Sequence, residues 1–262
     1  MRKFHSTKPM ERLVWAIIAI ACLMIAWYIG ATKSELGIFP SPIEVLKRLL
    51  RAFSEPIGTM TIQMHILYSL SRVAVGVTLG SISGIVLGLF MGMNDDINAF
   101  VSPLFYIVRP IPTVAWIPLS IMWFGLGETT KYFLIFISSF TGCTIQAFSG
   151  VKSVDQTLIG AAKMLGASDF RVFHTIILPS CVPDICLGIQ AALSSGWATV
   201  VAAEMVRSSE GVGWLIVAGQ NNLDMEQILV GIVVIGCVGA VITTIASIIE
   251  SRLCRWNNRS GV

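Results

Sequence analysis

The chain has 262 residues, of which 55% are hydrophobic and 13% charged, with a net charge of +3 and a mean hydropathy of +0.78. Soluble domains carry about a quarter charged residues, so this composition excludes an ordinary soluble domain and indicates an integral membrane protein. The small positive charge is spread over the loops and does not favour nucleic-acid binding. We expect an all-α, polytopic bundle of membrane helices.

A helix that crosses the hydrocarbon layer needs roughly twenty mostly apolar residues. The first such run has no charge between Arg12 and Lys33 and is too long for the core of a signal peptide, so we expect a retained span. About six transmembrane helices are predicted, at 13–31, 70–93, 103–125, 131–149, 184–206 and 227–250.

The distribution of Lys and Arg predicts the orientation, because cytoplasmic flanks are enriched in both. Basic residues gather before residue 13, in the polar segment 150–183 and after residue 251, and six spans place all three on one side. We therefore expect both termini to be cytoplasmic. The bias is incomplete, since the opposite connection 32–66 also holds four basic residues.

That connection contains a segment, 42–53, whose apolar residues recur with helical spacing. The pattern predicts an external amphipathic helix that rests on the membrane interface.

The second span repeats glycine every four residues, at Gly76, Gly80, Gly84, Gly88 and Gly92. Glycines at this spacing share one helix face and permit close approach of a second backbone. We expect tight packing against a neighbouring helix, inside the chain or across a dimer. The alternative is a lining that leaves room for a solute.

The third span contains several prolines, at Pro103, in Arg109-Pro-Ile-Pro112 and at Pro118. Proline removes a helical hydrogen bond, so this span is predicted to bend or break. The freed carbonyls need partners in protein or a wet cavity, which excludes a lipid-facing position.

Two charges, Arg109 and Glu204, fall inside or at the margin of spans, where a charge needs a partner or water. Either they pair with each other, or Arg109 meets an anion in transit. Arg72, near the end of its span, is interpreted as an interface residue that extends toward water. Other polar and aromatic residues either line a path or pack between helices. The candidate translocation path comprises Arg109, Trp116, Thr141, Gln190, Trp197 and Glu204.

The polar segment 150–183 shows two short helical patterns around a glycine. Ser153 to Gln156 fits a capping box that begins the first helix, and Gly166 fits the C-terminal end of that helix. Ser168 fits the N-cap of a second helix that continues to about Ile176. Pro179 and Pro183 are predicted to stop that helix. The segment is either a knob for a soluble partner or a loop packed on its own bundle.

The sequence lacks the residues that several classes of function require. The six cysteines form no Cys-x-x-Cys pair and the three histidines no ligand spacing, so neither a metal site nor a disulfide framework is indicated. No Gly-x-x-x-x-Gly-Lys-Ser/Thr loop is present, so the chain is not expected to be an enzyme that hydrolyses ATP. A stand-alone channel or carrier and a membrane enzyme are the rival interpretations, and the spans show neither a relay of ionisable residues nor a catalytic cluster.

Separated motifs resemble one known family. Gly160-Ala-Ala-Lys-Met-Leu-Gly166, followed by Ile177-Leu-Pro179, resembles the Glu-Ala-Ala loop of bacterial ABC-importer permeases. Arg109-Pro-Ile-Pro112, Trp123-Phe-Gly-Leu-Gly127 and Gly196-Trp-Ala-Thr199 resemble the taurine, nitrate and aliphatic sulfonate branch, and most of all its taurine permeases. The resemblance covers roughly Phe39 to Trp256.

The resemblance implies a single permease domain over 1–262 with the type I ABC-importer fold. It also implies an ATPase-docking loop at about 150–183, with Gly160, Ala161, Ala162, Gly166, Ala167, Leu178 and Pro179 as its residues. Implied partners are a cytoplasmic ATPase dimer that binds the ATP, a second permease copy, most simply a homodimer, and a soluble or lipid-anchored substrate-binding protein. No cofactor is implied for the chain itself. The expected solute is a small organic anion, taurine or another alkanesulfonate, with nitrate or another small solute as the alternative.

One position departs from the family pattern, because Gly160 stands where the family usually has a glutamate. In the family that carboxylate is commonly linked to a basic residue of the ATPase. The contact is therefore absent here, or supplied by another group such as Asp155 or Asp169.

Overall fold

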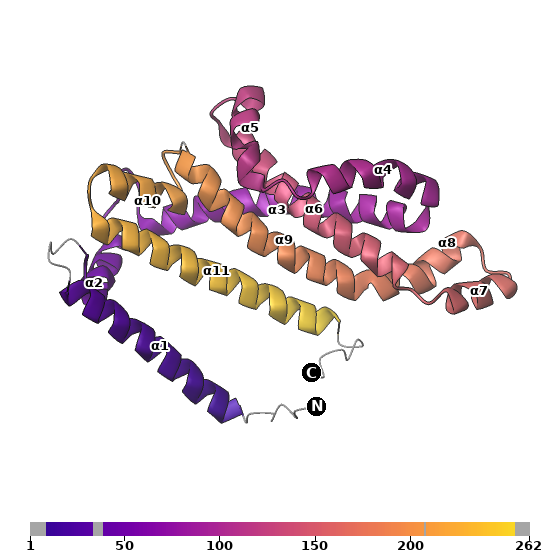
Figure 1. Cartoon of the computed structure of the whole chain (residues 1–262), viewed down its shortest axis with the longest axis horizontal. Helices are drawn as coiled ribbons and strands as arrows, with labels where there is room; N and C mark the ends of the chain where they lie inside the picture. The colour runs from indigo at the N-terminus through magenta and orange to yellow at the C-terminus, as the bar shows by residue number, and fades with distance from the viewer. Residues whose placement is uncertain (1–8, 34–38, 207, 255–262) are drawn as a thin grey trace. The chain divides into compact units, whose positions relative to one another are not determined.

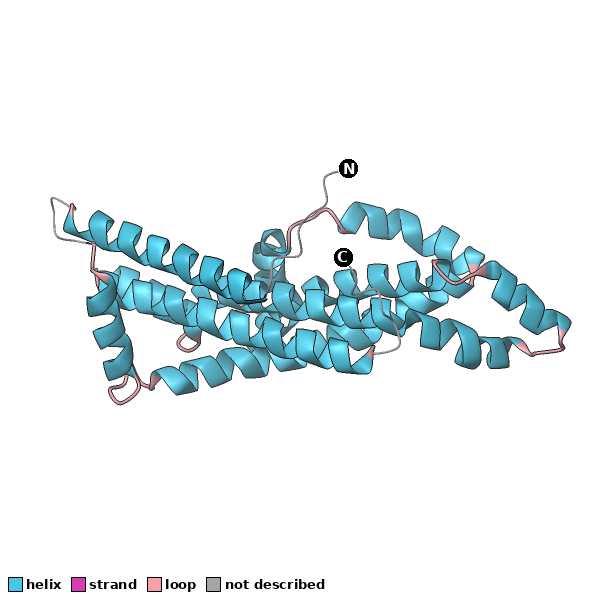
Figure 2. Cartoon of the chain, turned by 90° about the horizontal axis from the view of Figure 1, so that it is seen from below, coloured by secondary structure: helices cyan, strands magenta, loops and turns pink. Residues whose placement is uncertain are grey.

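The computed structural model describes residues 9–33, 39–206 and 208–254 (Figure 1). The described part is helical and contains no strand, as Figure 2 shows by its cyan ribbons; an isolated bridge joins Ile57 and Met60. This confirms the all-α prediction. The helices are α1 Pro9–Thr32, α2 Pro42–Ala52, α3 Ile62–Met93, α4 Asp95–Val108, α5 Ile117–Phe124, α6 Glu128–Lys152, α7 Gln156–Met164, α8 Asp169–Val172, α9 Leu178–Val206, α10 Val212–Asn221 and α11 Met225–Leu253, with a 3-10 turn η1 at Thr113–Trp116 and a π turn η2 at Phe173–Ile177.

Five helical segments of the described part are long and apolar enough to cross a membrane, and a sixth is added if the bent pair α4 and 113–124 counts as one span. The pair bends by 88°, which confirms the break predicted from the prolines. Most spans begin earlier than their apolar runs, for example α3 at Ile62 and α6 at Glu128.

The chain divides into two compact units, 1–62 with 215–233 and 63–214 with 234–262. In the first unit, Ser41 and Glu44 form a capping box that starts α2, and the indole of Trp27 donates to the carbonyl of Pro40 over 3.2 Å. Arg48 of α2 pairs with Asp224 at 3.6 Å.

Helix α2 has two apolar sides. Val45 and Ala52 are buried, whereas Ile43, Leu46 and Leu50 are more than half exposed. The predicted amphipathic helix is therefore present as a helix, and its location at the membrane interface stays a prediction.

The second unit is held by the glycine face of α3, which lies directly on α6. A Cβ atom at Gly76 would lie 2.6 Å from the side chain of Ile135, and one at Gly80 would lie 2.7 Å from the carbonyl oxygen of Phe136. Gly84 and Gly92 meet α6 just as closely. The packing alternative is confirmed, and the partner is a helix of the same chain.

Helix α9 packs along α6 by the same means. Gly188 of α9 lies against Cys143 and Gln146, and Gly196 lies against Ile135 and Val77. Helices α3, α6 and α9 therefore form a closely packed trio that fixes the relative positions of the groups at their ends.

The break after α4 occupies residues 109–112, and Pro112 is the N-cap of η1, which begins at Thr113. Gly125 ends α5 with a φ of 76°. The hydroxyl of Thr130 in α6 donates to the Gly125 carbonyl over 2.6 Å, so a carbonyl freed by the helix end is satisfied within the protein.

Candidate functional site

The segment α7 to α8 begins at a cap that differs from the expected one. The side chain of Asp155, not Ser153, caps α7 by accepting from the amide of Thr157 at 2.8 Å. Ser153 instead ends α6, and its hydroxyl donates to the Gly150 carbonyl. The same amide hydrogen bond holds the pKa of the exposed Asp155 carboxyl below its ordinary value.

Gly166 ends α7 as predicted. Its φ of +80° lies in the left-handed region, its amide donates to the Lys163 carbonyl, and the amide of Ala167 donates to the Ala162 carbonyl, both at 3.0 Å. These two bonds form a Schellman motif. No atom lies within 4 Å of a Cβ built at Gly166, so glycine is required here by the backbone and not by crowding.

Helix α8 is capped by Ser168 as expected, and Lys163 pairs with Asp169 across the turn at 2.9 Å. The prediction that Pro179 and Pro183 stop this helix is wrong. The π turn η2 follows α8 directly, with the amide of Leu178 donating five residues back to Phe173, and α9 continues through both prolines. Residues 169–206 therefore form one continuous helical path.

The tip of this helix-turn-helix exposes apolar side chains. Met164 is 85% exposed, Leu165 is 89% exposed and Phe170 is 74% exposed. A Cβ at Gly160 would also meet open space. Apolar side chains displayed together outside the spans are typical of a binding surface, which favours a docking knob over a loop packed on its own bundle.

The predicted docking residues all lie on this helix-turn-helix or just after it. Ala161 is exposed and Ala162 half-buried on α7, Ala167 follows the turn, and Leu178 and Pro179 begin α9. Their role in docking stays a prediction.

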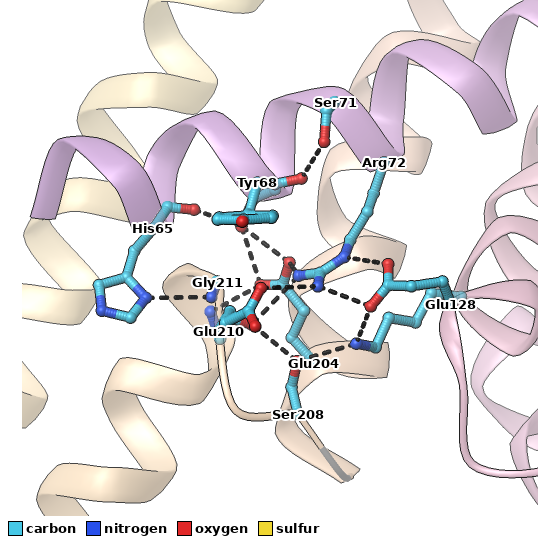
Figure 3. Close-up of polar contacts among 12 residues, drawn as sticks. His65, Tyr68, Ser71, Arg72, Glu128, Glu204, Ser208, Glu210 and Gly211 are labelled. Atoms are coloured by element: carbon cyan, nitrogen blue, oxygen red, sulfur yellow. Dashed lines mark hydrogen bonds and ion pairs between the residues drawn. The ribbon is translucent and has the colours of Figure 1, made fainter. Parts of the chain in front are cut away.

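A second candidate site joins the beginnings of α3 and α6 to the end of α9 (Figure 3). Arg72, on α3, is buried and saturated by acceptors. Its Nε and Nη2 donate to the two carboxylate oxygens of Glu128 at 2.6 and 2.7 Å, and its Nη1 donates to Glu204 at 2.8 Å. The interpretation of Arg72 as an interface residue that extends toward water is therefore wrong.

Glu204 is the buried centre of this polar cluster. Besides Arg72, its carboxylate accepts from the Ser69 hydroxyl at 2.8 Å and from the Gly213 amide at 2.9 Å. The amide of Val212 in turn donates to the Ser69 oxygen at 2.9 Å, so the connection after α9 is tied to α3. Glu204 pairs with Arg72, which excludes the predicted alternative of a pair with Arg109.

Lys131 supplies a second cation to the polar cluster. Its ammonium group donates to Glu128 at 2.7 Å and to the hydroxyl of Ser208 at 2.9 Å. Two cations thus face the carboxylates of Glu128 and Glu204, and the carboxylate of Glu210 lies 3.9 Å from Arg72. Sequence reasoning missed Arg72, Glu128 and Lys131 as a unit, although charges of both signs near corresponding ends of three spans are the signal that points to it.

The remaining candidates for the translocation path do not meet in one cavity. Arg109 lines a cavity between α4 and α6, and Gln190 lines a groove between α9 and α11. The indole N–H of Trp197 donates to the Ile235 carbonyl at 3.1 Å, and the hydroxyl of Thr141 donates within α6 to Ile137. The indole nitrogen of Trp116 is buried without a hydrogen-bond partner in the described part.

Comparison with known proteins places this geometry in a family. The family model for the binding-protein-dependent transport system inner membrane component matches residues 84–256. The taurine transport system permease protein TauC of Escherichia coli (strain K12) is 33% identical over 97% of this chain and 96% of its own. The nitrate import permease protein NrtB of Synechocystis is 29% identical over 92% of this chain and 89% of its own.

The fold also matches a solved structure, described as an inward-facing conformation of the MetNI methionine ABC transporter. The TM-score is 0.61 at 16% identity, covering 70% of this chain and 92% of that one. At that identity the match supports the fold alone, and it agrees with the expected permease bundle. The chain thus belongs to the family of binding-protein-dependent transport system inner membrane components, the multi-pass permeases of ABC transporters.

Proposed function

We propose that this chain is the permease subunit of an ATP-driven importer and forms the translocation path for a small organic anion, taurine or another alkanesulfonate. The similarity to TauC across almost the whole chain carries the proposal. The similarity to a nitrate permease supports a second candidate, in which the same architecture carries nitrate.

The exposed tip of α7 and α8 is the surface proposed to dock on a cytoplasmic ATPase dimer. Met164, Leu165 and Phe170 supply the apolar contacts, and the Gly166 turn sets the angle between the two helices. If the partner has a groove that buries these side chains, the complex is stabilised because three large apolar groups are removed from water. The termini then lie on the same, cytoplasmic side of the inner membrane.

Because Gly160 has no carboxylate, the charged contact is either absent or supplied by another group, and we propose the latter. Asp155 is engaged in capping α7, whereas the side chain of Asp169 is 89% exposed and pairs with the exposed Lys163 at 2.9 Å. We therefore assign to Asp169 the contact with a basic residue of the ATPase that the family usually makes with a glutamate.

Movement of the docked tip is transmitted to the other side of the membrane through α9. The helical path from Asp169 runs into α9, whose 29 residues span about 43 Å, and Glu204 of the polar cluster lies two residues before the end of α9. ATP-driven closure of the ATPases would displace the tip and, through α9, the end tied to α3 and α6. Such a two-state bundle, biased by nucleotide, alternates access to a central path.

The proposal requires three partners: the ATPase dimer, a second permease copy, which makes a homodimer in the simplest assembly, and a soluble or lipid-anchored protein that delivers the solute. The chain itself needs no cofactor for this role, because the ATPase supplies the nucleotide chemistry. Much of the selectivity then belongs to the delivering protein.

The docking role is tested by co-purification of the ATPase with Leu165→Asp. An aspartate at this 89% exposed position leaves the fold intact and removes an apolar contact, so ATPase recovery should fall at least tenfold. The matched control is Leu223→Asp, at a 90% exposed position on the predicted outer side, which should leave recovery unchanged. Undiminished recovery with Leu165→Asp would refute docking through this tip.

A further inference from the structure

Arg109 differs from Arg72, which also lies within the spans. The guanidinium of Arg72 is saturated by Glu128 and Glu204. The guanidinium of Arg109 makes no hydrogen bond or ion pair with any described residue, and it follows the last residue of α4 at the 88° bend. Five N–H donors are therefore left without an acceptor.

The side chain of Arg109, which is itself exposed, lines a partly open cavity of about 60 Å³, which has room for a few water molecules. Three of its eight lining residues are aromatic, and four carry a polar group. The lining residues are Met91, Ser102, Phe105, Tyr106, Arg109, Thr144, Ile145 and Phe148.

The hydrogen-bond inventory of the cavity favours an anion. Ser102 donates its hydroxyl proton to Asn98 at 2.6 Å, and Thr144 donates its own to the Phe140 carbonyl at 2.7 Å. Tyr106 makes no hydrogen bond with any described residue. The free donors are therefore the Arg109 guanidinium and the Tyr106 hydroxyl, and the cavity contains no carboxylate that would repel an anion.

The position along α6 places this cavity at membrane depth. Thr144 lies eight residues before Lys152, or about 12 Å along the helix, and about 24 Å from Glu128 at the other end. An arginine at such a level is costly unless an anion, water or an opposite charge accompanies it. No opposite charge lies in this cavity, which leaves water or an anion to accompany Arg109, and an anion is the ligand that fits its unpaired donors.

We propose that Arg109, with the Tyr106 hydroxyl, forms an anion-binding subsite that takes a monovalent oxyanion of the sulfonate class. The proposal rests on the proposed function, because the subsite is a binding site along the translocation path. A planar guanidinium makes two parallel hydrogen bonds to a sulfonate, as it does to carboxylate and phosphate, and the phenol supplies a third donor. The aromatic walls of the cavity suit the alkyl part of the solute.

Binding to the purified permease–ATPase complex tests the subsite without any need for transport. The dissociation constant for ethanesulfonate is obtained from the rise in melting temperature as it replaces chloride at constant ionic strength. Arg109→Gln should weaken binding at least tenfold, Arg109→Lys should retain part of the affinity, and Tyr106→Phe should weaken it a few-fold. Tyr106 is 65% exposed, so this last change removes a hydroxyl without disturbing the core.

The matched control is Arg51→Gln, an exposed arginine of α2, which should leave the dissociation constant unchanged. Absence of saturable ethanesulfonate binding to the wild type would overturn the subsite, and so would equal affinity in Arg109→Gln. Neutralisation of Arg109 by a carboxylate of a second copy would give the first of these results.

Uptake by the wild type separates this inference from the proposed function. Binding that depends on Arg109, without import of taurine or nitrate, would support the subsite and contradict the importer. Import of taurine that Arg109→Gln leaves unchanged would support the importer and overturn the subsite.

Discussion

Replacement of Arg72 by methionine would leave the Glu204 carboxylate buried without a cation. Arg72 bridges Glu128 and Glu204 with three hydrogen bonds of 2.6 to 2.8 Å, and Glu204 is only 1% exposed. Removal of one partner of a buried ion pair costs about 3–5 kcal/mol, because the remaining charge keeps its desolvation penalty. At roughly 2–4 °C per kcal/mol, the melting temperature of the permease–ATPase complex should fall by about 10 °C.

The double change Arg72→Met with Glu204→Met provides the decisive comparison. It removes both charges and restores apolar packing, so most of the lost stability should return. Glu128→Gln is the control, since the Glu128 side chain is 47% exposed and its pair with Arg72 is partly solvated. Glu128→Gln should lower the free energy of unfolding by about 1 kcal/mol or less. The reasoning would be refuted if Arg72→Met had the melting temperature of the wild type. It would also be refuted if the double variant were no more stable than Arg72→Met.

Three further predictions concern packing, the turn and its cap. Gly80→Leu should abolish the folded permease in the membrane, because even a Cβ there would lie 2.7 Å from the Phe136 carbonyl; Gly30→Leu, where nothing lies within 4 Å, should express normally in the same immunoblot. Gly166→Pro should stop ATP-dependent uptake while the protein stays in the membrane, because proline cannot adopt φ +80° and removes the amide that bonds to Lys163, whereas Gly166→Asn should retain uptake. The carboxylate of Asp155 stabilises α7 above its ordinary pKa of 3.8, and this stabilisation should be lost as the pH falls through the lower pKa of the folded state. Amide exchange at Thr157 should therefore lose protection with acid in the wild type and not in Asp155→Asn, whose cap does not titrate; equal pH dependence in both would contradict the assignment.

Composition and periodicity predicted the membrane helices because a span must be apolar over its whole length, whatever its neighbours are. The glycine repeat of α3 identified a packing face by the same local logic. The identity of its partner, α6, depends on tertiary structure and could not be read from the repeat alone. The proline-rich run predicted the break at 109–112, because the loss of amide donors is a property of the residues themselves.

The errors arose where local rules left a choice. Ser153 and Asp155 are both good caps, and only the exact end of α6 decides between them. The π turn before Pro179 lets the helix pass through prolines that were expected to end it. The polar cluster of Arg72, Glu128 and Glu204 joins residues more than fifty positions apart, so no local pattern contains it.

The measurement that tests the central claim most directly is uptake of labelled taurine into proteoliposomes that contain this permease and its ATPase, with the binding protein added outside. We predict uptake that requires ATP at the ATPase face and the binding protein at the opposite face, and that is lost with Gly166→Pro. Uptake by the permease alone, or uptake without ATP, would contradict the account.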